Sequence, residues 1–85
     1  MWFVYILRCA DNTLYTGITT NIDRRIHEHN TDNRMGSKYA RVRRPVILLY
    51  NESFTNRSEV SKREIVIKKM SRDEKERLIF QYLPS

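Results

Sequence analysis

The 85-residue sequence has little of several features that would mark other protein classes. Its single cysteine, Cys9, excludes an internal disulfide, and one thiol with two histidines is too few for a structural zinc site. No hydrophobic run approaches the roughly 20 residues of a membrane-spanning helix, so we expect no membrane segment. The apolar start Trp2–Leu7 lacks a basic leader and a small-residue cleavage site, unlike a secretory signal. These absences predict a cytoplasmic protein.

Glycine and proline are also scarce, with two residues each, while 40% of the residues are hydrophobic. This composition is typical of a folded chain rather than a disordered one. We expect one domain over residues 1–85, because compact domains usually hold about 100 to 150 residues. At this size folding buries roughly 60% of the unfolded chain's surface, so the core is small.

Basic residues outnumber acidic ones, and the formal net charge is +6. Such a field attracts polyanions, of which nucleic acid is the commonest in the cytosol. No acidic residue lies between Asn33 and Asn51, and this stretch holds the basic and aromatic residues Arg34, Lys38, Tyr39, Arg41, Arg43 and Arg44. A solvated basic loop is the simpler interpretation. We favour nucleic-acid contact, because arginine and lysine bind phosphates and Tyr39 could stack on a base or sugar.

Three segments are predicted to be strands. Trp2–Leu7 is β-branched and aromatic, and Leu14–Ile18 is expected to pair with it across a turn at Asp11-Asn12. Val46–Tyr50, introduced by a proline, is predicted to be the third strand.

The remaining segments are predicted to be helical. Beyond a short helical turn over 37–42, three helices are expected at about 21–30, after residue 56 or 58, and from residue 71 to about 82, each with a capping residue or capping-box pair: Thr20 with Asp23, Asn56 or Ser58, and Ser71 with Glu74. The order is therefore β-β-α-β-α-α. The simplest α+β packing for it is a three-stranded antiparallel sheet flanked by helices.

Polar residues on helix faces that should be buried are the informative ones. In the first helix, Ile22 and Ile26 define the inward side, and Arg25 and His29 lie beside them. Three other side chains are expected to fall away from this side: Arg24, His27 and Glu28.

A carboxylate holds a similar position in the next helix. Glu64 follows Val60 by four residues and precedes Ile67 by three, so it lies in the middle of the apolar face. A carboxylate there carries a desolvation cost unless it is paired or binds a cation.

Two tyrosines lie on the predicted hairpin, Tyr5 in the first strand and Tyr15 in the second, just before Gly17. A glycine inside a strand often marks the close approach of a ligand or of another backbone. Taken singly, these residues have ordinary structural roles, such as tyrosine packing or an ion pair. Together, two tyrosines, an inward Arg/His pair and an inward Glu supply a cation, proton-transfer groups and a metal ligand, which suit phosphodiester hydrolysis.

The same residues resemble the motifs of the GIY-YIG nuclease superfamily: Phe3-Val4-Tyr5, Tyr15-Thr16-Gly17, Asn21–Arg25 with His29-Asn30, and Glu64. The chain is most similar to the small bacterial stand-alone members, which also resemble the nuclease domain of the eukaryotic SLX-type enzymes. The resemblance runs from Trp2 to about Leu83. Phe3-Val4 replaces Gly-Ile and Thr16 replaces isoleucine, and neither change removes a reactive group.

The resemblance implies a set of catalytic residues, with Glu64 also binding Mg²⁺ or Mn²⁺: Tyr5, Tyr15, Arg25, His29 and Glu64. Arg25 would neutralise a non-bridging phosphate oxygen. Tyr5 would be the general base, with Tyr15 and His29 holding the water or the phosphate, although His29 could instead take the proton. A later polar residue of the family corresponds to Ser37 or Lys38.

We therefore expect a metal-dependent endonuclease that acts as a monomer on nucleic acid, more probable as DNA than as RNA. So small a domain has few side chains for base edges, so we expect recognition by nucleic-acid structure or through a targeting protein, as in DNA repair. The alternatives are a non-catalytic nucleic-acid-binding module of the same fold and a plain protein-interaction domain.

Overall fold

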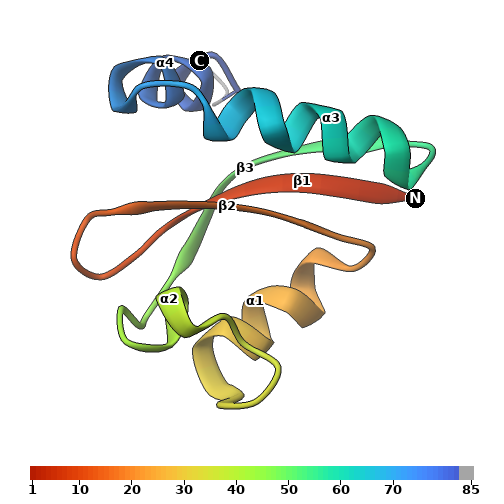
Figure 1. Cartoon of the computed structure of the whole chain (residues 1–85). Coiled ribbons are helices and arrows are strands. Elements are labelled where there is room, and N and C mark those ends of the chain that lie inside the picture. The colour runs from red at the N-terminus through yellow and green to blue at the C-terminus, as the bar shows by residue number, and fades with distance from the viewer. Residues whose placement is uncertain (83–85) are drawn as a thin grey trace.

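The computed structural model describes residues 1–82, and it contains a three-stranded antiparallel sheet with helices on both faces (Figure 1). In chain order its elements are β1 (Trp2–Arg8), β2 (Leu14–Thr19), α1 (Ile22–Thr31), α2 (Lys38–Arg41), β3 (Ile47–Phe54), α3 (Arg57–Lys68) and α4 (Arg72–Tyr82). The predicted α+β class and the order β-β-α-β-α-α are confirmed, with α2 as the short helical turn. Within residues 1–82, no helix is both long and apolar enough to cross a membrane.

The first strand lies in the middle of the sheet, whose order is β2-β1-β3. Tyr5 is paired with Gly17 of β2 on one side and with Asn51 of β3 on the other. Because side chains alternate along a strand, Val4 and Ile6 face α3 and α4, whereas Tyr5 faces α1 and α2.

Each face of the sheet has its own buried cluster. The cluster under α3 and α4 is Val4, Ile6, Tyr50, Val60, Ile67 and Ile79. The cluster above α1 and α2 is Tyr5, Leu7, Cys9, Ala40 and Val46. Cys9 is a free, buried thiol within the second cluster.

The helix starts confirm two predictions and correct one. Ser71 and Glu74 bond each other's backbone N–H groups at 3.2 and 3.0 Å, and Asn56 caps α3. The predicted cap of α1, Thr20, is wrong by one residue. Asn21 caps the helix, because its side-chain oxygen accepts from the Arg24 N–H at 3.0 Å.

The third strand is longer than predicted and begins one residue later. It continues through Asn51, Glu52 and Ser53, which are polar and interrupted the apolar pattern on which the prediction depended. These residues pair with Tyr5, Val4 and Phe3 of the central strand. Backbone pairing with β1 therefore extends the strand where its own side chains gave no signal.

Candidate active site

The site is built around the hydroxyl of Tyr5, which crosses over Gly17 on the edge strand. The Tyr5 side chain is buried, and a Cβ at residue 17 would lie 2.5 Å from its Oη and 2.7 Å from its Cζ. Only glycine leaves this space open without a shift of the ring. The group that closely approaches Gly17 is the side chain of Tyr5, and not the ligand or second backbone that the sequence suggested.

Three rings meet at this point. The ring centroids of Tyr5 and Tyr15 are 6.4 Å apart, and the His29 ring lies 6.1 Å from the first and 5.3 Å from the second. His29 reaches them from the last turn of α1 and is fully buried. The Tyr5 Oη and the His29 Nε2 are 2.9 Å apart, a hydrogen bond.

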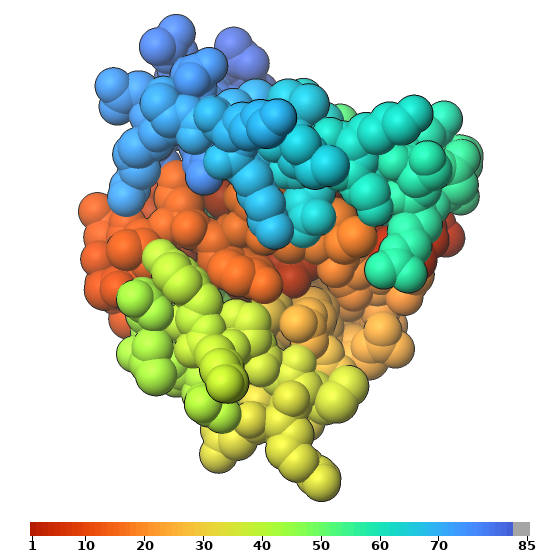
Figure 2. All heavy atoms as spheres, in the orientation of Figure 1, coloured from red at the N-terminus to blue at the C-terminus, as the bar shows by residue number. Residues whose placement is uncertain are grey.

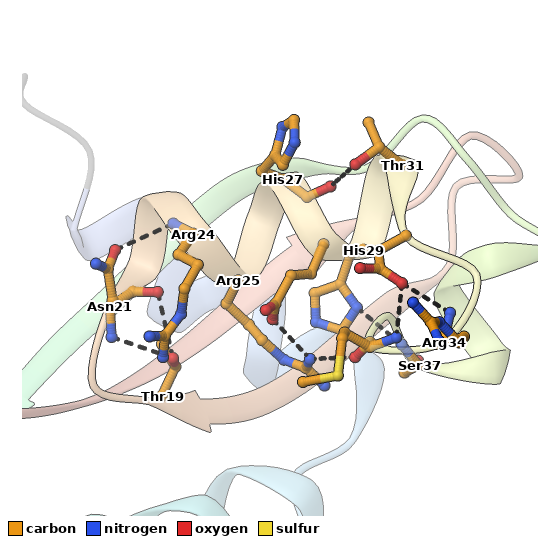
Figure 3. A network of polar contacts seen from close by, with 12 residues as sticks. Thr19, Asn21, Arg24, Arg25, His27, His29, Thr31, Arg34 and Ser37 are labelled. Atoms are coloured by element: carbon orange, nitrogen blue, oxygen red, sulfur yellow. Dashed lines mark hydrogen bonds and ion pairs between the residues drawn. The ribbon is translucent and has the colours of Figure 1, made fainter.

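The backbone determines how His29 uses its two nitrogens. Its Nδ1 accepts a hydrogen bond from the Ser37 N–H at 3.3 Å, as Figure 3 shows. Burial, and next the positive charge of Arg25, lower the pKa of His29 to about 4, so the ring is neutral at pH 7. A neutral ring whose Nδ1 accepts has its proton on Nε2. His29 therefore donates to the Tyr5 oxygen.

The environment of Tyr5 favours the neutral phenol. Burial, followed by the neighbouring Tyr15, raises the pKa of Tyr5 to about 12, while Arg25 acts in the opposite direction. The charge of Glu64, on the helix α3 that covers the other face of the sheet, also raises this pKa.

Arg25 lies on the inward side of α1, as predicted, but its guanidinium already has partners. It donates to Glu28 at 3.0 Å and to the Met35 carbonyl. The prediction that Glu28 points away is wrong. The loop after α1 folds back so tightly that a Cβ at Gly36 would lie 2.5 Å from the Glu28 carbonyl oxygen, and this loop covers that side of the helix.

Two other residues of α1 behave as predicted: Arg24 and His27 are exposed. Figure 3 shows His27 on the far side of the helix from Arg25 and His29. Asn30 has a structural role, because its side chain bonds both the N–H and the carbonyl of Val46, at 2.8 and 3.2 Å. This clasp fixes the chain at the entry to β3 against the end of α1.

Glu64 lies on α3 between two fully buried residues, Val60 and Ile67, as the spacing predicted. Its side chain is 20% exposed, and its partner is the exposed Lys68, 3.4 Å away. An exposed pair one helical turn apart is weak, so Lys68 can give way to a cation.

Glu64 is also a suitable ligand for a hard divalent ion. Residues 1–82 contain no cluster of three His, Cys, Asp or Glu side chains that could hold a metal. A single carboxylate fits Mg²⁺, which keeps several waters and usually takes one or two protein carboxylates together with substrate phosphates.

Most arginines of the basic stretch form hydrogen bonds or ion pairs with other groups of the protein itself. The guanidinium of Arg44 donates to the His29 and Asp32 carbonyls at 2.6 and 3.1 Å, and Arg41 donates to the Asn33 carbonyl at 2.9 Å. These bonds hold the loop that presents the Ser37 N–H to His29. Arg34 and Lys38 are exposed.

Tyr39 is already stacked. Its ring lies 5.8 Å from that of Tyr15, at an interplanar angle of 26°, and the Arg43 guanidinium lies 3.9 Å from its centroid. Arg43 also pairs with Asp11 at 3.0 Å. Arg43 must move before a base can use the ring face that it covers.

Sequence reasoning missed the contribution of backbone groups. The Ser37 N–H and the Met35 carbonyl orient His29 and Arg25, and main-chain groups leave no trace in a side-chain pattern. Figure 2 shows the sheet between α3 above and the α1–α2 segment below.

Comparison with known proteins identifies the family of this chain. The family model of the GIY-YIG catalytic domain matches residues 1–77. The chain is 59% identical over 78 residues to UPF0213 protein DP2720 of Desulfotalea psychrophila, which covers 92% of this chain and 70% of that protein. It is 49% identical over 77 residues to UPF0213 protein SH2523 of Staphylococcus haemolyticus, covering 91% and 92%.

A solved structure is also similar. The solution NMR structure of protein EF2693 from E. faecalis has a TM-score of 0.64 and 41% sequence identity, over 94% of this chain and 83% of that one. The sequence motifs, the fold and the family model agree over most of the chain. The chain therefore belongs to the GIY-YIG family.

Proposed function

We propose that this protein is a metal-dependent endonuclease that hydrolyses phosphodiester bonds in DNA. The observation that supports this most directly is the buried hydrogen bond from neutral His29 to Tyr5, beside Arg25. We also propose that residues 1–85 act as one domain, since all the described elements pack on one sheet.

Tyr5 is the general base in this proposal. Its oxygen accepts from His29 Nε2, so its own proton points elsewhere, and the same bond stabilises the phenolate once that proton is lost. With a pKa of about 12 the free protein keeps Tyr5 protonated at pH 7, so further positive charge is needed. Glu64 would hold a divalent cation, which when bound would supply that positive charge and act as a Lewis acid on the phosphate.

His29 is not the direct base. Its ring is fully buried, Nδ1 is taken by the Ser37 N–H, and Nε2 has the proton that bonds Tyr5. It therefore orients and stabilises Tyr5, and Tyr15 packs against both rings. Arg25 neutralises charge on a non-bridging phosphate oxygen, which its planar fork suits better than the point charge of a lysine.

The experiment that tests this function compares two glutamates of α3. Glu64→Gln should abolish Mg²⁺-dependent nicking of a flap or branched DNA while leaving DNA affinity near normal, because it removes the ligand and keeps the shape. Glu59→Gln, an exposed carboxylate at the start of the same helix, is the matched control and should cleave as the parent does. Undiminished cleavage by Glu64→Gln would contradict the metal assignment.

One observation favours the non-catalytic alternative, a nucleic-acid-binding module of the same fold. The Arg25 guanidinium is already bonded to Glu28 and to the Met35 carbonyl, as a structural arginine would be. Cleavage with Mg²⁺ that is lost with a chelator separates the two functions. Salt-sensitive binding is expected from both and decides nothing.

A further inference from the structure

A hollow of about 450 Å³ lies at the edge of the sheet beside Arg25, where β2 ends and α1 begins. Its volume is within the roughly 300–1,000 Å³ of small-molecule sites. Its walls come from both sides of the β2 edge, and they include Trp2, Ile18, Arg24, Arg25, Glu28 and Met35. The hollow therefore adjoins the position proposed for the scissile phosphate, but it contains none of the tyrosines.

One wall of the hollow is the indole of Trp2. The guanidinium of Arg57, the first residue of α3, lies 5.4 Å from the centroid of the Trp2 ring. Tryptophan and arginine are both planar groups on which nucleobases stack, so a base would stack on the Arg57 guanidinium or take its place over the indole.

The charge of the hollow suits a nucleic-acid strand. Glu28 is neutralised by its ion pair with Arg25. Arg24 and Arg57 are exposed, and neither is paired with an acidic side chain in the part of the chain that the structure describes. Arg24 lines the hollow and Arg57 lies over the Trp2 ring, so these two guanidinium groups stand beside an aromatic side chain, the combination that single-strand binding surfaces use.

We propose that this hollow is a subsite for an unpaired nucleobase next to the phosphate at Arg25, and that the protein therefore prefers single-stranded DNA, such as the arm of a flap, to intact duplex. The subsite rests on the proposed function, because its position is defined relative to the phosphate that Arg25 is proposed to bind. A base inside a duplex is covered on both faces by its neighbours and presents no face to Trp2. An unpaired base can present a ring face to Trp2 without the cost of unstacking.

The experiment uses Trp2 itself, which is the only tryptophan of the chain. With a chelator present to prevent cleavage, the full-length protein is titrated with a short oligothymidine strand and with the same strand annealed to its complement. Binding is measured independently from the anisotropy of a labelled strand. Single-stranded DNA should quench the indole emission over the concentrations at which the anisotropy rises, and the duplex should not.

Variants locate the subsite. Trp2→Leu should weaken single-strand binding about 5- to 150-fold, the range for loss of one base–aromatic stack, and leave duplex binding unchanged. Trp2→Phe keeps a ring and should retain most of the affinity. Phe80→Leu, an aromatic residue 78% exposed on α4, is the matched control and should change neither.

Each of the following three outcomes would contradict a different part of the proposal. Binding with unchanged emission overturns the subsite and leaves the nuclease proposal standing. Equal quenching by strand and duplex overturns the preference for unpaired bases. Absence of both binding and cleavage overturns the subsite together with the proposed function. The emission titration uses the parent protein, so it tests the subsite at Trp2 even if Trp2→Leu does not fold.

Discussion

The two faces of the sheet each bury a tyrosine hydroxyl, and the two hydroxyls have opposite partners. On the α1 side, Tyr5 accepts from neutral His29. On the α3 side, Tyr50 donates to the carboxylate of Glu52, which also pairs with Arg63 at 3.3 Å. Burial is the main cause that raises the pKa of both tyrosines. Burial alone therefore does not distinguish a reactive tyrosine from a structural one.

The partners make the difference. Loss of the Tyr50 proton would place a phenolate against the Glu52 carboxylate, which is a like-charge contact in a partly buried place. Loss of the Tyr5 proton places a phenolate against an N–H donor with Arg25 nearby. Arg63 lowers the pKa of Tyr50 as Arg25 lowers that of Tyr5, so the difference between the two hydroxyls is the direct hydrogen-bond partner, a carboxylate for Tyr50 and an imidazole N–H for Tyr5.

The largest expected effect is removal of the Tyr5 hydroxyl. Tyr5→Phe should lower kcat by about 10²- to 10⁴-fold, because general-base catalysis contributes on that scale. Tyr50→Phe is the matched control, and it should leave kcat unchanged while costing about 1 kcal/mol of stability for its lost hydrogen bond. Similar losses of kcat in the two variants would show that Tyr5 is no more than a packing residue.

The next comparison concerns the two arginines. Arg25→Ala should lower kcat by about 10²-fold or more, as for loss of one transition-state donor. Arg63→Ala breaks the ion pair with Glu52 on the opposite face and should affect thermal stability rather than turnover. A change of kcat within about twofold for Arg25→Ala, far below that scale, would assign Arg25 to a structural role.

A smaller effect is expected from pH. His29 is held neutral by burial and, next, by the charge of Arg25, with Arg44 adding to this and Glu28 opposing it. Its pKa is about 4 in the folded protein against 6.5 ordinarily, so the unfolded chain binds the proton more readily between these values. Stability should be fully present above pH 6.5 and fall by roughly 2 to 3 kcal/mol as the pH is lowered toward 4.

Urea denaturation across this pH range measures the decline. The exposed His27 on the same helix provides the control: His27→Gln should keep the pH dependence, and His29→Gln should lose this part of it. An NMR titration that gave His29 an ordinary pKa would contradict the prediction without any variant.

The smallest effect is expected at Gly17, the residue that makes room for Tyr5 at the edge strand. Gly17→Ala places a methyl group 2.5 Å from the Tyr5 Oη, so the ring must shift. We expect about 1 to 3 kcal/mol of destabilisation, as for overpacking, together with reduced turnover. In a Tyr5→Phe background the contact with Oη is gone but the contact with Cζ at 2.7 Å remains, so the penalty should shrink only in part, which a double-mutant cycle would measure. Equal penalties in both backgrounds would mean that the hydroxyl adds nothing to the clash with the ring.

The fold was predictable because its signals are local. The turn at Asp11-Asn12 closes the hairpin as expected, with both Thr13 donors bonded to the Asp11 carboxylate. The capping box at Ser71 and Glu74 needs only four residues. Thr20 and Asn21 are adjacent capping residues, and the sequence does not choose between them. The choice follows from the Asn21 N–H, which bonds the Thr19 hydroxyl in three dimensions.

The site residues were predictable only on the helices, where the spacing of apolar residues shows which side chains face the core. That spacing placed His29 and Glu64 on buried faces. It gave no information on the loop after α1, so the partner of Arg25 and the internal bonds of Arg44 were missed. Arg44 donates to a carbonyl fifteen residues earlier in the chain, and a local sequence pattern gives no information on contacts between residues so far apart in the sequence.

The central place of β1 has a consequence for how the protein is made. The first strand to leave the ribosome is the one that both other strands must flank, and β3 is synthesised only after residue 46. A growing chain therefore contains both site tyrosines, Arg25 and His29 long before the carboxylate of Glu64 exists. Under the proposed function, a chain released before residue 64 would lack the metal ligand and with it the cleavage activity.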